Sequence, residues 1–176
     1  MNPPKAKLFA GLLLSPQTGL GDIISALEKS FGKCDYTGRE IKFDFTDYYS
    51  REMGKPLRRV FLSFSGLFDP GKLAETKLKS IEIERKFSIG GDRRVNIDPG
   101  YMEPSKVVLA STKNFSHRIY LRSGIYAEVT LIRKSGAFRP LEWTFPDYRS
   151  AGYAAILEDI RDLFMSSEIK GKRSGA

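Results

Sequence analysis

The sequence has very few of the residues on which metal sites and disulfide scaffolds depend. Among 176 residues there is one cysteine, Cys34, and one histidine, His117. These counts exclude an intramolecular disulfide, a Cys-rich zinc site and a His-rich metal cluster. No apolar run approaches the ~20 residues of a membrane-spanning helix, and no Gly-x-x-x-x-Gly-Lys-Ser/Thr phosphate loop occurs. We predict a cytoplasmic protein with no metal site and no membrane association.

Positive charge is in excess, but it is not concentrated. Lys and Arg number 29 against 21 Asp and Glu, a formal net charge of +8. Residues 1–7 and 166–176 each contribute two of these charges, which leaves +4 on residues 8–165. Nucleic-acid-binding domains usually gather their basic residues on one face or helix, whereas here they alternate with acids. The charge therefore supports a nucleic-acid partner only weakly, and residues 166–176 are expected to form a flexible basic tail.

The apolar pattern predicts one α+β domain spanning residues 1–176. The predicted elements are strands at 7–14, 41–46, 57–67 and 94–98, helices at 20–31 and from Asp69-Pro70, a turn at Pro99-Gly100, a hairpin at 117–132 and a C-terminal helix that includes 153–164. This order predicts a ferredoxin-like split βαβ core with a largely antiparallel sheet, to which a β-hairpin and a C-terminal helix are added. The pattern leaves residues 82–87 open between helix and strand, and it does not decide the structure of residues 104–114.

The register of the predicted hairpin follows from its two faces. Ile119 and Leu121 alternate with polar residues on the first strand, as do Ala127 and Val129 on the second. Directly opposed residues share a face, so a two-residue turn would pair apolar with polar side chains. We therefore expect a turn of odd length, three residues centred on Gly124, that pairs Leu121 with Ala127.

Polar side chains on this hairpin and on the strand at 94–98 are the leading candidates for a binding site. Arg offers a planar hydrogen-bonding fork for an anion, and a carboxylate orients the fork or takes a proton. The donor-rich loop before the hairpin adds Lys113 and His117, and the aromatic loop at 47–56 adds two residues at the rim. The candidate ligand-binding residues are Asn96, Asp98, Lys113, His117, Arg118, Tyr120, Glu128, Asp47 and Tyr48. The alternative is a solvated sheet face with cross-strand ion pairs and a structural histidine.

One further pattern is similar to a known signature. Glu82-Ile-Glu84-Arg-Lys86 resembles the Glu-x-Glu-x-Lys signature of triphosphate-tunnel enzymes, which lies on an N-terminal strand. Here it follows a helix at mid-chain, and about 90 residues remain, few for a barrel of many strands. The tunnel interpretation is kept as a minor alternative.

Several segments together resemble a bacterial family known as domain of unknown function 4416. They are Phe43–Tyr49, Glu52–Gly54, Arg93–Tyr101, Thr112-Lys113, His117–Tyr120, Gly124–Leu131 and Trp143–Arg149. The resemblance covers nearly the whole chain and implies no particular activity, cofactor or substrate. It does place the family's characteristic segments on the polar clusters described above.

These observations lead to one functional hypothesis and two alternatives. The protein is expected to bind a small anionic or nucleotide-like ligand on a polar sheet face. The first alternative is a phosphoester-processing enzyme in which His117 or Asp98 exchanges protons with the substrate. The second is an RNA-associated or scaffold module that uses dispersed basic charge. The sequence indicates neither a cofactor nor an oligomeric state.

Overall fold

The centre of the fold is strand β1 (Lys7–Leu14), all eight residues of which are buried. In the computed structural model, which describes residues 4–173, β1 pairs antiparallel with a strand on each side. Its even-numbered apolar residues face the core beneath helices α1 (Leu20–Phe31) and α3 (Leu73–Lys86), and Phe9 faces helix α4 (Ala151–Arg173). This arrangement explains why residues 7–14 are apolar on both faces, as a central strand must be.

The described residues form one open antiparallel sheet of nine strands with four α-helices, which confirms the predicted α+β class. The strands are β1, β2 (Cys34–Thr37), β3 (Ile41–Phe43), β4 (Leu57–Phe64), β5 (Val95–Glu103), β6 (Lys106–Ser111), β7 (Ile119–Arg122), β8 (Ile125–Lys134) and β9 (Ala137–Pro140). The helices are α1 (Leu20–Phe31), α2 (Ser50–Met53), α3 (Leu73–Lys86) and α4 (Ala151–Arg173). The strand order is β2-β4-β1-β5-β6-β8-β7, with β3 beside β4 and β9 beside β8.

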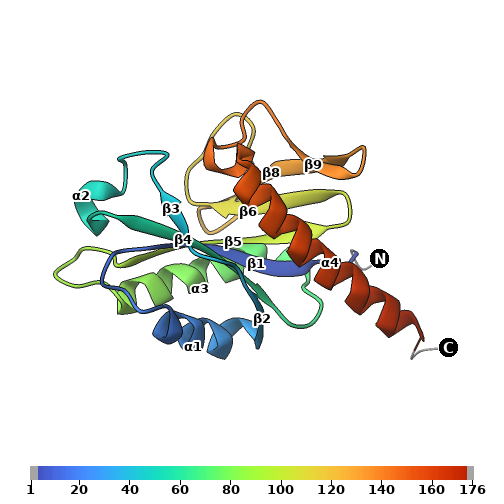
Figure 1. Cartoon of the computed structure of the whole chain (residues 1–176), viewed down its shortest axis with the longest axis horizontal. Coiled ribbons are helices and arrows are strands. Elements are labelled where there is room, and N and C mark those ends of the chain that lie inside the picture. The colour runs from blue at the N-terminus through green and yellow to red at the C-terminus, as the bar shows by residue number, and fades with distance from the viewer. Residues whose placement is uncertain (1–3, 174–176) are drawn as a thin grey trace.

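Helices cover both faces of this sheet. Figure 1 shows α1 and α3 side by side below the strands, while α4 crosses on the other side. Ile23 and Leu27 of α1 and Ile83 of α3 pack on one face, and Ile156 and Ile160 of α4 pack on the opposite one. None of the helices within residues 4–173 has the length and apolar character needed to cross a membrane.

Both predicted helices in the first half of the chain are confirmed. Helix α1 spans 20–31 and ends at Gly32, whose φ of 90° favours glycine. Asp69 caps the turn before α3 by accepting a hydrogen bond from the Gly71 amide at 2.9 Å. Helix α3 continues to Lys86, so residues 82–86 are helical. The triphosphate-tunnel alternative, which needs Glu82 and Glu84 on a strand, is therefore wrong.

The predicted turn at Pro99-Gly100 is wrong, because β5 runs through both residues to Glu103. Residues 106–111, which the pattern did not decide, form β6. Gly100 is needed where these strands meet, since a Cβ there would lie 2.5 Å from the Val108 carbonyl oxygen. Proline and glycine here serve the close packing of strands and not a reversal of the chain.

The hairpin register is also wrong in its details. The turn has two residues, Ser123 and Gly124, both with positive φ (51° and 74°), and not three. Leu121 does not pair with Ala127, which lies opposite Ile119 instead. Leu121 lies in an irregularity between Tyr120 and Arg122. Because Leu121 is an extra residue on β7, Ile119 lies opposite Ala127 and shares a face with it, although the turn has an even number of residues. The bulge therefore produces the pairing of apolar with apolar residues that a three-residue turn was expected to produce.

The structure also differs from the prediction at one unpredicted strand, at the end of β3 and in the C-terminal segment. The short strand β2, on the edge beside β4, was not predicted, and the predicted strand at 41–46 is shorter, ending at Phe43. The segment expected to be a flexible tail, 166–176, belongs to α4 as far as Arg173. Residues 174–176 lie outside the described residues.

Candidate functional site

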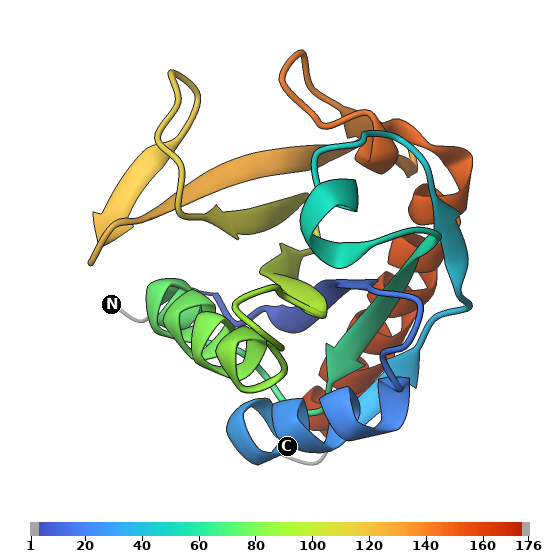
Figure 2. The ribbon, with the colours of Figure 1, turned by 90° about the vertical axis from the view of Figure 1, so that its left-hand side faces the viewer.

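The candidate site begins where β5 and β6 diverge. β1 pairs with β5 from Val95 onward, but β6 pairs with β5 only from Gly100 to Glu103. Pro99 has no amide hydrogen to donate to a neighbouring strand, which favours the end of pairing at this point. Residues 95–99 therefore have a sheet edge that no other strand among the described residues covers. Figure 2 shows the diverging ends of the sheet, with α2 and its flanking loops beside them.

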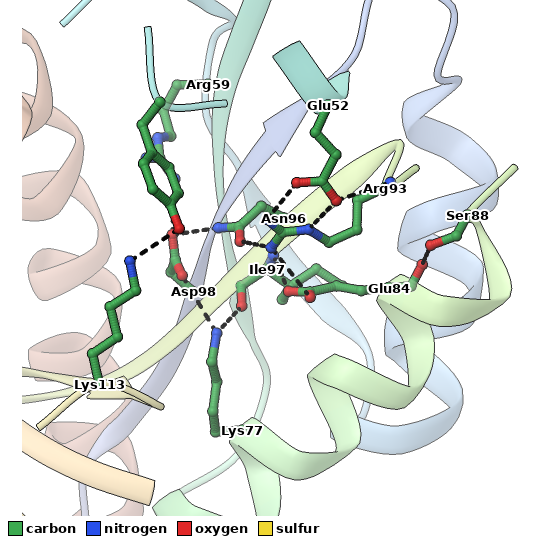
Figure 3. Close-up of polar contacts among 11 residues, drawn as sticks. Glu52, Arg59, Lys77, Glu84, Ser88, Arg93, Asn96, Ile97, Asp98 and Lys113 are labelled. Carbon is green, nitrogen blue, oxygen red and sulfur yellow. Dashed lines mark hydrogen bonds and ion pairs between the residues drawn. The ribbon is translucent and has the colours of Figure 1, made fainter. Parts of the chain in front are cut away.

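Side chains of α3 complete the open edge of β5. The Lys77 ammonium donates to the Ile97 carbonyl oxygen at 2.7 Å, and Glu84 accepts from the Ile97 amide at 2.6 Å (Figure 3). Burial raises the pKa of Glu84, an effect that Lys77 and Arg93 only partly offset. Both side chains lie on the buried side of α3, where a charge is retained only if it has partners.

A cavity of about 720 Å³ occupies the space between these elements. Its walls come from β3 and the following loop, β4, α3, the start of β5, the end of β6, the loop before β7, β8 and the segment before α4. This volume lies within the range of small-molecule sites in proteins. Five basic and four acidic side chains line it, together with Phe43, Phe45, Tyr48, Tyr49, Phe145 and Tyr148.

Arg59 is the centre of the charges at the base of this cavity. The side chain is 3% exposed and contacts two carboxylates, Asp147 at 3.2 Å and Asp98 at 3.5 Å. Its Nε donates to the Tyr153 hydroxyl at 3.1 Å. Gly11 permits this approach, since a Cβ there would lie 3.3 Å from Arg59 Nη1 and 3.1 Å from the Tyr148 hydroxyl.

The two carboxylates beside Arg59 respond oppositely to their surroundings. Burial opposes the ionisation of Asp98, but Lys77, Arg59 and the Asn96 amide outweigh it and lower the pKa of Asp98. At Asp147 burial is the larger effect, and the pKa of that carboxyl is raised despite Arg59. One carboxyl is thus held ionised while the other is held closer to its protonated form.

The neighbouring ion pair, Glu52 with Arg93, connects α2 to the segment just before β5. Arg93 donates from Nε and Nη2 to the two oxygens of Glu52, each at 2.7 Å, and from Nη1 to Asn96 at 2.9 Å. Asn96 in turn donates to Asp98 at 2.8 Å. The hydrogen bonds from Arg93 hold the pKa of Glu52 below its usual range. A planar fork on a carboxylate fixes orientation, so α2 is held in place beside the cavity.

The cavity brings together six of the nine residues predicted from the sequence. These are Tyr48, Asn96, Asp98, Lys113, Arg118 and Glu128. Asp47 is exposed outside the lining and pairs with Lys55. Tyr120 is 58% exposed on β7 and packs edge-on against Tyr126, also away from the cavity.

His117 lies in a second, shallower hollow with Phe115, Ser116, Glu142 and Trp143. Its ring stacks on Trp143 with centroids 5.2 Å apart and 10° between the planes. Its Nε2 lies 3.2 Å from Glu128, which also accepts from Arg118 Nε at 2.6 Å. His117 and Asp98 therefore line different hollows, with Glu128 buried beside the histidine.

The sequence interpretation missed the base of the cavity, which consists of Arg59, Lys77, Glu84, Arg93 and Asp147. Two of these residues carried a usable signal. Arg59 shares its strand face with Phe61 and Leu57, and Lys77 stands four residues from both Leu73 and Ile81 on the apolar stripe of its helix. A charged residue on an apolar stripe predicts a buried partner of opposite sign. Within residues 4–173, no group of three His, Cys, Asp or Glu side chains is arranged to hold a metal ion.

Comparison with known proteins supplies the family. The family model of the domain of unknown function DUF4416 matches residues 4–164. The chain belongs to this family. The DUF4416 match includes every cavity-lining residue, from Phe43 to Tyr148. No curated protein and no solved structure matches the chain.

Proposed function

We propose that this DUF4416 protein binds a small anionic, nucleotide-like molecule in the cavity between β5 and β6. The observation that carries the proposal is the combination of aromatic rings and basic side chains around about 720 Å³ of space. Ligand sites of this kind are mostly apolar, with a few polar groups that fix orientation. Two residues of the polar sheet face that was expected to hold the ligand, Asp98 and Glu128, line this cavity.

A further proposal concerns the framework of the site, a ferredoxin-like split βαβ core. The order β2-β4-β1-β5 supports it, because β4 lies between the two strands, β1 and β2, that α1 connects. Packing of α1 and α3 on one face of these strands is also in agreement.

A thermal-shift screen of nucleotides, phosphorylated metabolites and carboxylated metabolites tests the ligand-binding proposal. A ligand present at 100 times its Kd stabilises the folded state by about 2.7 kcal/mol, which is several degrees in Tm. We expect at least one compound to raise the Tm of the wild type but not of Ser111→Trp, which fills the cavity from the end of β6. Lys134→Trp, at an exposed position outside the lining, is the matched control. The proposal fails if no compound raises the Tm, or if Ser111→Trp responds as the wild type does.

The phosphoester-processing alternative has less support. It assigns the proton exchange to His117 or Asp98, but His117 lies outside the cavity, and Asp98 is already bonded to Arg59, Lys77 and Asn96. His117 is also held between Trp143 and Glu128, contacts that suit a structural histidine.

A scaffold function is the second candidate, and the hairpin at β7 favours it. Phe115, Ile119 and Tyr120 are 64%, 71% and 58% exposed. Exposed apolar side chains on an edge strand are typical of interaction surfaces. RNA binding with a steep salt dependence, lost when the basic residues after 166 are removed, would favour the RNA-associated form of this candidate.

A further inference from the structure

The charges around the cavity are divided between its buried base and its exposed rim. Four of the five basic lining residues have a carboxylate partner: Arg59 with Asp98 and Asp147, Lys77 with Asp98, Arg93 with Glu52, and Arg118 with Glu128. Among the side chains that the structure describes, residues 4–167, Lys113 has no carboxylate oxygen within 4.0 Å of its ammonium. The base of the cavity is thus close to internally neutralised, and one cation is left for a ligand.

The rim has a simple composition. Seven of the lining residues are exposed: Phe45, Thr46, Tyr48, Thr112, Lys113, Phe145 and Pro146. Lys113 is the single charged residue in this described set. Its ammonium donates to the Tyr48 hydroxyl at 3.2 Å and lies 4.4 Å from the centroid of that ring. The ammonium is therefore held at the mouth of the cavity beside exposed aromatic faces.

Because the basic residues at the base are paired and Lys113 at the rim is not, the cavity favours some anions over others. A phosphate at the base would compete with carboxylates that already hold Arg59 and Lys77, and breaking such buried pairs is costly. A phosphate at Lys113 displaces only a neutral hydroxyl and gains a charge-assisted hydrogen bond. One free cation matches one anionic group better than a chain of several phosphates.

We infer that the ligand is a compound of the nucleoside monophosphate class: a planar polar ring with one anionic group. The anion binds at Lys113, and the ring lies among Phe45, Tyr48 and Phe145. The polar edge of the ring faces the base, where Asp98 is part-exposed at 27% and accepts hydrogen bonds. This inference rests on the proposed function and sharpens it by fixing the number and place of the charges.

Isothermal titration calorimetry with adenosine, adenosine 5′-monophosphate and adenosine 5′-triphosphate tests the inference, with the cytidine compounds as a second series. In the wild type we expect at least one monophosphate to bind about tenfold more tightly than its nucleoside, one charge-assisted contact being worth that ratio. We expect Lys113→Gln to abolish this preference, so that nucleoside and monophosphate bind the variant equally. Lys134→Gln, which removes an equal charge outside the cavity, keeps the preference.

Three results would overturn the inference: equal binding of nucleoside and monophosphate, a preference that survives Lys113→Gln, or triphosphates binding about tenfold more tightly than monophosphates. Binding of nucleosides that Ser111→Trp abolishes, without any effect of phosphate, would remove this inference and the anionic character of the proposed ligand, while the cavity would remain the binding place. If no nucleoside or nucleotide binds but another compound of the metabolite screen does, the inference is again wrong and the proposed function survives. Absence of binding in both experiments rejects the proposed function itself.

Discussion

Arg59 holds the base of the cavity together by contacting Asp98, Asp147 and the Tyr153 hydroxyl. Replacement by the apolar Arg59→Met leaves the buried Asp147 and the part-exposed Asp98 without their shared cation. We expect a loss of about 3–5 kcal/mol in the free energy of unfolding, measured by urea denaturation at pH 7. Arg122→Met, which removes an exposed ion pair with Glu75, is the control and should cost less than about 1 kcal/mol. Equal losses in the two variants would contradict this account of Arg59.

The two tyrosines near Arg59 make a matched pair of tests. The Tyr153 hydroxyl accepts from Arg59, whereas the buried Tyr148 hydroxyl has no hydrogen-bond partner among the described residues. Tyr153→Phe should lower the free energy of unfolding by about 1–2 kcal/mol, because a hydrogen bond to a charged group is lost. Tyr148→Phe removes an unsatisfied hydroxyl and should leave stability unchanged or slightly higher. A larger loss for Tyr148→Phe than for Tyr153→Phe would show that the Tyr148 hydroxyl is bonded after all.

Asp98 and Asp147 should affect the pH dependence of stability with opposite signs. The lowered pKa of Asp98 means that its ionised form stabilises the fold, a contribution present at neutral pH and lost as pH falls through that pKa. Asp98→Asn should therefore cost about 2–3 kcal/mol at pH 7, and the loss should fade only in strong acid. The raised pKa of Asp147 means that ionisation of this carboxyl costs stability, so Asp147→Asn should be more stable than the wild type at pH 7, a gain that vanishes as pH falls through that pKa.

Urea denaturation between about pH 3 and pH 8 measures the stability of both variants relative to the wild type. This range covers roughly the interval in which carboxyl groups titrate. The difference between wild type and Asp147→Asn should disappear at a higher pH than the difference between wild type and Asp98→Asn. The reverse order would mean that the environments of the two carboxyls have been misassigned.

Helix α3 is more than a cover for the sheet, since it supplies the groups that strand β6 would otherwise provide to β5. Glu84→Ala removes the acceptor of the Ile97 amide and should cost about 1–3 kcal/mol. Hydrogen exchange followed by NMR should show that the Ile97 amide loses its protection. Glu84→Gln keeps an acceptor oxygen and should retain most of that protection. Unchanged exchange in Glu84→Ala would contradict a role for α3 in completing the edge of β5.

Elements with a strong local pattern were predictable, and those set by distant contacts were not. The apolar stripe of α1 and the cap at Asp69 depend on neighbours within a few residues, and both are confirmed. Pro99-Gly100 has the local composition of a turn, but pairing with β1 keeps it in a strand. The bulge at Leu121 likewise sets a register that alternation does not predict, with Ile119 opposite Ala127 but Arg122 opposite Ile125.

The candidate site was predictable in part for the same reason. Alternation along residues 94–98 and the donor-rich loop at 112–118 identified Asn96, Asp98 and Lys113, which line the cavity. Arg59 and Asp147 are separated by 88 residues and meet only in the folded chain. Their ion pair follows from the packing of β4 against the segment before α4, which no local pattern encodes.

In the whole molecule, the diverging sheet separates the cavity, where we propose that a ligand binds, from an exposed hairpin, which is the surface that the scaffold alternative would use. The cavity lies between β5 and β6, and the exposed apolar residues lie on β7 at the far edge of the sheet. Mapping whether a bound molecule contacts the cavity or the β7 hairpin therefore distinguishes ligand binding from the scaffold alternative.

The most direct test is a ¹H–¹⁵N correlation spectrum recorded while adenosine 5′-monophosphate and cytidine 5′-monophosphate are titrated in turn into the wild-type protein. We predict that the largest shifts occur at the amides of Asn96, Asp98, Ser111, Lys113 and Phe145, around the cavity. Shifts confined to the hairpin residues 115–121 and the C-terminal helix, or no shifts at all with either nucleotide, would contradict a nucleotide-like ligand in this cavity.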